Sequence, residues 1–322
     1  MPTATPYVLQ QAEAERLLGQ IDVHQAMLAM FRSLAAGEAV QPAQQLVEFP
    51  HAAGDFINYL GVLAAEGVYG VKTSPYIVRQ QGPLVSAWTL LMSMHSGQPL
   101  LLCDAGLLTT ARTAATTAVA VDALAPAQAR RLAVIGSGAV ARAHVHYARG
   151  LRDWQSIGIY SPGLLEQDSA QLQQLQRLDS RLQLCASLEE ATDGAEVIML
   201  CTSSAGPVLD PATLGRPALI TSISTNAPRA HEVPPQALAD MDVYCDYRTT
   251  TPASAGEMCL ASEGHGWDRS LIRGDLAELL SDQAPLPDYR RHVFFRSIGL
   301  GLEDIALAHA LYRLKCQQEV VA

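Results

Sequence analysis

The feature that most constrains this chain is a glycine-rich turn between an apolar segment and a helical pattern. Residues 131–135 (RLAVI) form a nearly continuous apolar run, and GSGAVA follows directly at residues 136–141. In the order strand, turn and helix, this G-x-G-x-x-A spacing is typical of a dinucleotide-binding unit. Gly136 permits the tight turn, Gly138 lets the backbone approach a pyrophosphate, and the small Ala141 lets the helix pack closely on the strand.

The helix that begins at this turn would present free N–H groups and the positive end of its dipole to phosphate groups. The alternative is an ordinary tight strand–helix turn without a ligand, and the strand–turn–helix setting favours the cofactor. We therefore predict an NAD(H) or NADP(H) site made of the turn and of hydroxyl-bearing residues elsewhere: Gly136, Ser137, Gly138, Ala139, Val140, Ser161, Thr202 and Ser297.

The choice between the two cofactors depends on the end of the next predicted strand. NAD-selective proteins usually place Asp or Glu there, where it accepts hydrogen bonds from the adenosine ribose. This chain has Tyr160, Ser161 and Pro162 instead, and its first acid is Glu166. Nothing in the stretch would repel a 2′-phosphate, although no adjacent arginine would hold one. The balance favours NADP(H) slightly over NAD(H).

The pattern of apolar residues changes along the chain. From about residue 44 to 103, short apolar runs separated by turn residues predict an antiparallel sheet. Residues 109–124 are alanine-rich and apolar on most faces, which predicts a buried helix. From residue 131 onward strands alternate with helices, which predicts a parallel, doubly wound sheet. The expected fold class is therefore α/β, a Rossmann-type sheet preceded by an N-terminal α+β domain.

Composition excludes several functions. The 322 residues are 49% apolar and 17% charged, as in chains with a sizeable core, and the formal net charge is −10. No run of Lys and Arg suggests a nucleic-acid partner, and no His, Cys or acidic cluster has the spacing of metal ligands. Six cysteines without a C-x-x-C pair predict buried thiols in a reducing compartment. With no secretory signal or membrane-length apolar stretch, we expect a cytoplasmic protein.

Several short motifs follow one another along the chain in a specific order and spacing. The motifs are Gly70-Val71-Lys72, the segment 108–114 (LTTARTA), the GSGAVA turn, Pro207-Val208-Leu209, Asn226-Ala227-Pro228 with Glu232, Val243-Tyr244-Cys245-Asp246, and Ser297-Ile298-Gly299 with Glu303-Asp304. Together they resemble the ornithine cyclodeaminase/μ-crystallin family over nearly the whole chain. Within that family the chain looks most similar to the bacterial Δ1-pyrroline-2-carboxylate reductases of hydroxyproline and proline metabolism.

The resemblance implies a homodimer and two domains with different roles. A substrate and dimerisation domain would occupy residues 1–115, and the C-terminal helix 302–322 would return to it. The dinucleotide-binding Rossmann domain would occupy residues 116–301.

The resemblance also implies roles for two cations. Lys72 and Arg112 match the family positions that hold the substrate carboxylate, for which a planar fork and a point charge are well suited. The alternatives are a solvated lysine and an exposed helix residue. Arg112, however, is the only charge between Asp104 and Asp122. Because an unpaired charge inside an apolar helix is costly, we expect a ligand or a carboxylate to face it.

A third match is Asp246, which ends the predicted strand VYCDY and corresponds to the family's catalytic aspartate. The alternative is an Asp that caps the following loop. Two departures from the family concern the substrate pocket. Gln44 replaces an arginine of the family's P-x-R segment, leaving a neutral donor for the carboxylate, and residues 62–65 (VLAA) replace a Met-Pro segment.

We therefore expect an NAD(P)H-dependent enzyme that reduces a C=N bond. The expected substrate is Δ1-pyrroline-2-carboxylate or Δ1-piperideine-2-carboxylate, and the product is L-proline or L-pipecolate. Asp246 would stabilise the protonated imine or relay its proton. The alternatives are ornithine cyclodeaminase, which regenerates its NAD+ within the cycle, and a non-catalytic crystallin-like protein that keeps the cofactor site.

Overall fold

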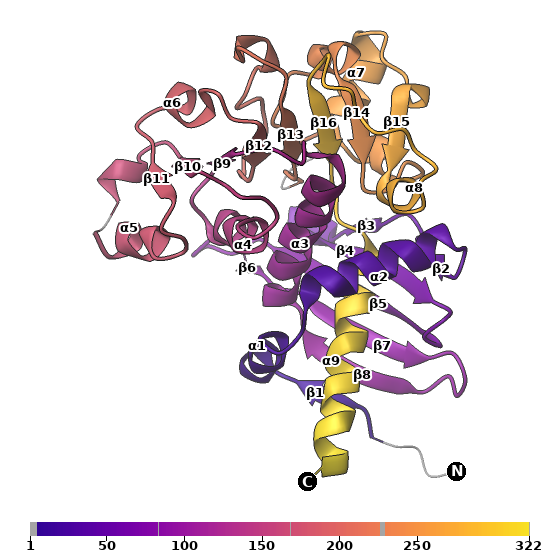
Figure 1. Cartoon of the computed structure of the whole chain (residues 1–322). Coiled ribbons are helices and arrows are strands. Elements are labelled where there is room, and N and C mark those ends of the chain that lie inside the picture. The colour runs from indigo at the N-terminus through magenta and orange to yellow at the C-terminus, as the bar shows by residue number, and fades with distance from the viewer. Residues whose placement is uncertain (1–4, 83, 168, 226–228, 322) are drawn as a thin grey trace. The chain divides into compact units, whose positions relative to one another are not determined.

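The computed structural model describes residues 5–82, 84–167, 169–225 and 229–321. It divides into two compact units, of which unit 1 comprises Met1–Arg112 and Leu300–Ala322, and unit 2 comprises Thr113–Gly299 (Figure 1). Each unit contains its own sheet, and the sheet of unit 2 is entirely parallel. The predicted α/β class with a Rossmann-type sheet is confirmed. The motif Asn226-Ala227-Pro228 lies outside the described residues.

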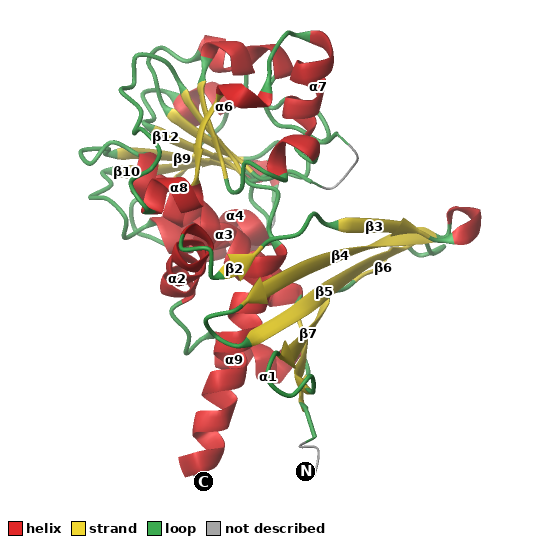
Figure 2. Ribbon diagram, turned by 90° about the vertical axis from the view of Figure 1, so that its right-hand side faces the viewer, coloured by secondary structure: helices red, strands yellow, loops and turns green. Residues whose placement is uncertain are grey.

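Unit 1 contains a mostly antiparallel sheet in the order β1-β8-β7-β5-β4-β2, with β3 paired to β4 and β6 paired to β5 (Figure 2). Among the strand pairs of this sheet that the described residues form, only β1–β8 is parallel. The strands are β1 (Tyr7–Leu9), β2 (Ala39–Val40), β3 (Gln45–Glu48), β4 (Gly54–Leu63), β5 (Val68–Ile77), β6 (Leu84–Val85), β7 (Trp88–Ser93) and β8 (Pro99–Asp104).

The helices of unit 1 are α1 (Gln11–Leu18), α2 (Val23–Ala35), the first part of α3 (Gly106–Leu124), and α9 (Gly301–Val321). Helix α9 contacts β4, β5, β7 and β8, and it begins in close backbone contact with β4. A Cβ at Gly301 would lie 2.1 Å from the carbonyl oxygen of Leu60, so only glycine permits this approach. The close start fixes the first turn of α9, including Glu303 and Asp304, against the sheet.

Unit 2 contains an eight-stranded parallel sheet in the order β11-β10-β9-β12-β13-β16-β14-β15. Its strands are β9 (Arg131–Ile135), β10 (Ser156–Tyr160), β11 (Leu182–Leu184), β12 (Val197–Leu200), β13 (Leu219–Ser222), β14 (Asp242–Cys245), β15 (Ile272–Asp275) and β16 (Val293–Arg296). Along the chain, strands β10 and β11 are added on one side of β9, and the later strands are added on the other side, beginning with β12. The strand order therefore reverses between β9 and β12. In such sheets, ligands bind at this reversal, outside the carboxyl ends of the strands.

Unit 2 contains the second part of α3 and several further helices, and short 3-10 turns occur in both units. The further helices are α4 (Ala139–Ala148), α5 (Ser169–Gln176), α6 (Leu188–Thr192), α7 (Gly256–Gly264) and α8 (Leu276–Leu280). The 3-10 turns are Pro50–Ala52, Leu164–Glu166, Pro211–Thr213, Pro235–Asp240, Thr251–Ala253 and Arg269–Leu271. Within the described ranges, no helix combines the length and apolar content needed to cross a bilayer.

Candidate functional site

A cleft of about 760 Å³ lies in unit 2 where the carboxyl ends of β9, β10 and β12 meet. Its walls also include Ser203, Ser204 and Ile223 from the segments that follow β12 and β13. The cleft therefore occupies the expected ligand position of a doubly wound sheet. Seven of the eight predicted cofactor residues line it, namely Gly136, Ser137, Gly138, Ala139, Val140, Ser161 and Thr202.

The two glycines of the turn have different roles. Gly136 has a φ of +125°, and a Cβ there would lie 2.5 Å from the carbonyl oxygen of Cys201. Gly138 precedes α4 in an extended conformation, and no atom lies within 4 Å of its ideal Cβ position. The space in front of Gly138 is open, and the N-terminus of a ten-residue helix begins beside it. These features fit a pyrophosphate.

The end of the cleft at β10 is where the adenosine ribose of a dinucleotide is expected. It is lined by Tyr160, the last residue of β10, and by Ser161 and Pro162, and none of the cleft-lining residues in the described part of the chain is Asp or Glu. Arg142 donates a hydrogen bond to the carbonyl oxygen of Ser137 at 3.1 Å, which places a cation beside the turn. A 2′-phosphate would therefore meet no repulsive carboxylate in the lining of this cleft.

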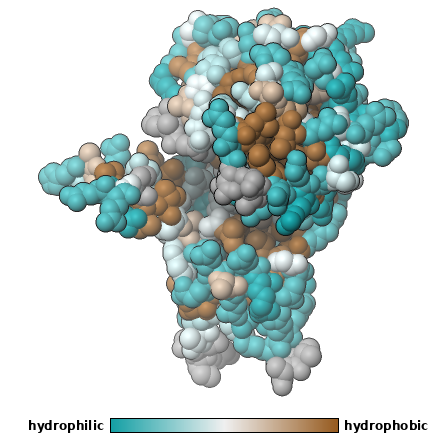
Figure 3. Space-filling model, turned by 90° about the vertical axis from the view of Figure 1, so that its left-hand side faces the viewer, coloured by the Kyte–Doolittle hydropathy of each residue, from teal (hydrophilic) through white to brown (hydrophobic). Residues whose placement is uncertain are grey.

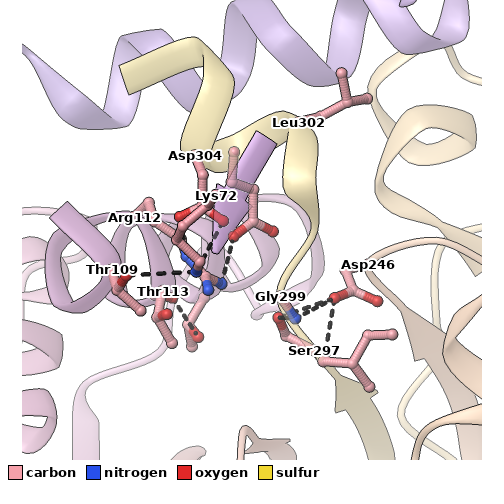
Figure 4. A network of polar contacts seen from close by, with 12 residues as sticks. Lys72, Thr109, Arg112, Thr113, Asp246, Ser297, Gly299, Leu302 and Asp304 are labelled. Atoms are coloured by element: carbon pink, nitrogen blue, oxygen red, sulfur yellow. Dashed lines mark hydrogen bonds and ion pairs between the residues drawn. The ribbon is translucent and has the colours of Figure 1, made fainter. Parts of the chain in front are cut away.

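Ser297, the eighth predicted cofactor residue, does not line this cleft; its hydroxyl donates to Asp246 Oδ2 at 3.0 Å instead (Figure 4). The same oxygen accepts from the backbone N–H groups of Ile298 at 2.7 Å and Gly299 at 3.1 Å. Oδ1 of Asp246 accepts from the N–H of Tyr247 at 2.9 Å and from the hydroxyl of Thr251.

Asp246 therefore anchors two loops of unit 2 through a fully buried carboxylate. Burial raises the pKa of Asp246, and the hydrogen bonds from Thr251 and Ile298 oppose that rise. Its bonds to Tyr247 and Thr251 are those of the loop-capping alternative considered from the sequence. The proton-relay role stays a prediction.

Lys72 and Arg112 lie together in unit 1, each with a buried carboxylate as partner (Figure 4). Lys72 Nζ is 2.9 Å from Asp304 Oδ2. Arg112 reaches Glu303 Oε2 through Nη1 at 2.9 Å and Asp304 Oδ1 through Nε at 3.3 Å. Lys72 is 1% exposed and Arg112 4% exposed, so neither is a solvated surface residue. The carboxylate expected opposite Arg112 is thus supplied by the chain itself.

We define Lys72, Arg112, Glu303 and Asp304 as the cation cluster, and two further side chains contact it. The ring of Tyr59, paired with Lys72 across β4 and β5, lies 4.1 Å from Lys72 Nζ. Thr109 accepts a hydrogen bond from Nζ at 3.4 Å. Burial lowers the pKa of Lys72 to about 8, against the opposing effect of Asp304. For Arg112, burial acts to lower the pKa, but the charges of Asp304 and Glu303 hold it above its usual value.

Gln44 is half-buried between β2 and β3. In the part of the chain that the structure describes, its side chain forms no hydrogen bond with Lys72 or Arg112. Gln41 in the same segment accepts a hydrogen bond from the N–H of Leu302 at 3.0 Å, which helps to hold the start of α9. The substrate-binding role of Gln44 stays a prediction.

Sequence reasoning assigned no role to Glu303 and Asp304, although a signal for them exists. They are the only Asp, Glu, Lys or Arg residues between Arg296 and Arg313, in a segment that is otherwise almost entirely apolar. As with Arg112, two carboxylates inside an apolar helix predict that buried cations face them.

His144 lies in α4, the helix that follows the glycine-rich turn, and its side chain is fully buried. Its Nδ1 lies 2.8 Å from the carbonyl oxygen of Val140, which can only accept, so Nδ1 carries the hydrogen. Its Nε2 lies 3.0 Å from the hydroxyl of Thr117. Burial lowers the pKa of His144 from 6.5 to about 4. The neutral ring is therefore the form that stabilises unit 2.

This lowered pKa predicts a loss of stability in mild acid. The unfolded chain takes up a proton near pH 6.5 and the folded chain only near pH 4, so the contribution is complete above pH 6.5 and declines between these values. We expect the free energy of unfolding to fall by about 2 kcal/mol more in the wild type than in His144→Gln between about pH 7 and pH 5. Urea titrations at both pH values measure this difference, and parallel pH dependence in the two proteins would contradict it.

The family model of the ornithine cyclodeaminase/mu-crystallin family matches residues 4–318. The chain is 71% identical over 315 residues to the NAD(P)H-dependent anabolic L-arginine dehydrogenase DauB of Pseudomonas aeruginosa, covering 98% of this chain and 99% of that protein. It is 24% identical over 261 residues to a Delta(1)-pyrroline-2-carboxylate reductase of Bacillus cereus, covering 80% of each chain.

The fold also matches solved structures. The Delta(1)-pyrroline-2-carboxylate reductase of Thermococcus litoralis, solved with NADH and L-proline, superposes with a TM-score of 0.86 at 20% identity and covers 97% of this chain and 98% of that one. At that identity the likeness shows the fold alone. With a family model spanning nearly its full length, the chain belongs to the ornithine cyclodeaminase/mu-crystallin family.

Proposed function

We propose that this enzyme, an NAD(P)-dependent oxidoreductase of carbon–nitrogen bonds, reduces the imine of 5-guanidino-2-oxopentanoate to L-arginine. The observation that supports this substrate is the 71% identity to the arginine dehydrogenase of Pseudomonas aeruginosa over almost the full length of both chains. A bound reduced nicotinamide supplies the hydride for such a reaction. We further propose that the enzyme acts in the cytoplasm.

The proposed roles follow the two units. In unit 2 the turn at Gly136–Gly138 holds the pyrophosphate, and Ser161 and Thr202 line the two sides of the same cleft. In unit 1 Lys72 and Arg112 hold the substrate carboxylate, with Gln44 as a neutral donor. Asp246 anchors the loops that contain Tyr247 and Ser297, and it is also our candidate for the proton relay.

The charges of the cation cluster suit an imino acid. Two cations face two carboxylates, so the formal charges of the cluster balance. The imino acid group of the substrate is also neutral overall when its nitrogen is protonated, because its carboxylate is negative and its iminium is positive. The cluster can therefore accept this zwitterion without leaving a net buried charge, which would be costly. The net charge of −10 further favours a substrate with a cationic guanidinium group.

We also propose a homodimer formed through the sheet of unit 1. The ends of β4 and β5, with β3 and β6, extend as an arm of this sheet (Figure 2), and apolar surface is visible on the arm in Figure 3. A second copy would cover its exposed apolar side chains. These are Leu46, Val47, Tyr76, Val78, Leu84 and Val85.

The test of this function measures consumption of NADPH and NADH by the purified chain. We expect oxidation with 5-guanidino-2-oxopentanoate only when ammonium is present, because ammonium supplies the imine nitrogen. The matched control is 2-oxopentanoate, which lacks the guanidinium group and should react poorly. Turnover of 2-oxopentanoate at the same rate would show that the enzyme does not select substrates by the guanidinium group.

A second candidate is the cyclic imine Δ1-pyrroline-2-carboxylate, or its six-membered homologue, reduced to L-proline or L-pipecolate. It is favoured by the likeness to the Bacillus cereus reductase. In both candidate substrates the carbon of the C=N bond is attached directly to the carboxylate. Cofactor oxidation with this imine and none with the guanidino acid would establish the second candidate. Conversion of ornithine to proline without net cofactor turnover would instead identify a cyclodeaminase.

A further inference from the structure

Glu232 is fully buried in unit 2 and accepts five hydrogen bonds from the chain. Its Oε1 accepts from the backbone N–H of Thr202 at 2.9 Å and from the Thr202 hydroxyl at 2.7 Å. Its Oε2 accepts from the hydroxyl of Ser222 at 2.8 Å and from the N–H groups of Ile223 at 3.0 Å and Ser224 at 3.2 Å. One carboxylate thus joins the residues that follow β12 to those at the end of β13.

The residues held by Glu232 form one side of the cofactor cleft. Thr202 and Ile223 line the cleft, whereas Glu232 itself does not. They lie on the β12–β13 side of β9, and Tyr160 and Ser161 lie on the β10 side. In a doubly wound sheet the adenosine ribose binds at the end of the strand that follows the glycine turn, here β10. The β12–β13 side is therefore left for the nicotinamide half.

A second buried charged side chain, that of Arg296, also forms hydrogen bonds with the segment that follows β13. Arg296 donates to the carbonyl oxygen of Ser224 at 2.5 Å and pairs through Nε with Glu257 at 2.7 Å. The hydroxyl of Ser224 donates to the carbonyl oxygen of Ser204, which lines the cleft, at 2.7 Å. Both backbone groups of Ser224 are thus bonded to charged side chains. Charge-assisted hydrogen bonds of this kind are stronger than neutral ones.

We propose that Glu232 is a positioning residue that fixes the nicotinamide-side wall of the cofactor cleft by holding Thr202 and Ile223. The inference rests on the proposed cofactor function of unit 2. Both oxygens of Glu232 accept from backbone N–H groups, which cannot turn to become acceptors. A glutamine would direct its NH2 group at one of these two sets of donors, so part of the wall would lose its partner.

The experiment compares Glu232→Gln with the wild type by calorimetry, using NADPH and the adenosine-half fragment 2′,5′-ADP. Because only the nicotinamide side is disturbed, we expect NADPH to bind about tenfold to a hundredfold more weakly, and 2′,5′-ADP to bind within about twofold of wild type. The primary isotope effect with NADPH deuterated at the transferred position should also rise, since the ring is held less well.

The matched control is Asp275→Asn. Asp275 is also a buried carboxylate of unit 2, where it accepts from the N–H groups of Glu278 at 3.0 Å and Arg248 at 3.1 Å, but it does not line the cleft. This variant should lose stability while keeping both ligand affinities. A purely structural role for Glu232 would give the same result as the control.

Each outcome decides the inference. Equal weakening of NADPH and 2′,5′-ADP in Glu232→Gln, or unchanged NADPH affinity, would overturn it. If that variant does not fold, Ser222→Ala carries the test, because it removes one donor to Glu232 outside the cleft and should weaken NADPH alone by about fivefold. No change in Ser222→Ala would then overturn the inference. Failure of the wild type to bind NADPH, NADH or 2′,5′-ADP would instead refute the proposed cofactor function.

Discussion

Gly138→Val is expected to abolish dinucleotide binding while the chain remains folded. No atom lies within 4 Å of the ideal Cβ position at Gly138, and its backbone is extended with a φ of −71°, which valine adopts readily. The new Cβ would therefore contact no atom of the protein, and the valine side chain would fill the space in front of the helix α4, where a pyrophosphate is expected. Calorimetry with NADPH and NADH should show no binding, and the circular dichroism spectrum should match that of the wild type.

The neighbouring glycine provides the control. A Cβ at Gly136 would lie 2.5 Å from the carbonyl oxygen of Cys201, and the φ of +125° disfavours any side chain. Gly136→Ala should therefore lower the melting temperature, unlike Gly138→Val. A Gly138→Val protein with wild-type affinity for NADPH would show that the dinucleotide binds elsewhere.

The Rossmann-type unit was predictable because buried parallel strands have a distinctive pattern. Strands β9 and β12 are almost continuous apolar runs, and the glycine turn follows β9 directly. These signals are local, since each depends on residues adjacent in the chain. The seven predicted cofactor residues that line the cleft could be expected to lie together, because they are at or near the carboxyl ends of such strands.

The cation cluster shows why the rest was harder to predict. Arg112 and Glu303 are 191 residues apart, and they meet because α9 packs on the sheet of unit 1. The sequence shows that Arg112 needs a negative partner, but local patterns cannot say whether that partner is a ligand or another part of the chain. Ser297 illustrates the same limit, because the contact with Asp246 depends on how β14 and β16 pair.

Arg112→Ala should reduce both stability and activity, because Glu303 and Asp304 would remain buried without the guanidinium group that contacts both of them. Removing one member of a buried ion pair costs about 3–5 kcal/mol of folding free energy. If Arg112 also holds the substrate carboxylate, kcat/KM for the imine should fall by a further amount equivalent to about 2–5 kcal/mol. Arg112→Lys should recover only part of the activity, because a lysine lacks the planar fork that reaches two acceptors.

A double variant separates these two effects. In Arg112→Ala/Glu303→Gln the carboxylate that Arg112 Nη1 contacts is neutral, so much of the lost stability should return. The lost activity should not return, because no guanidinium is present to hold the substrate. Urea denaturation and steady-state kinetics on the single and double variants measure the two quantities independently. Recovery of kcat/KM together with stability would mean that Arg112 serves only the fold, and unchanged kcat/KM in Arg112→Ala would place the carboxylate site elsewhere.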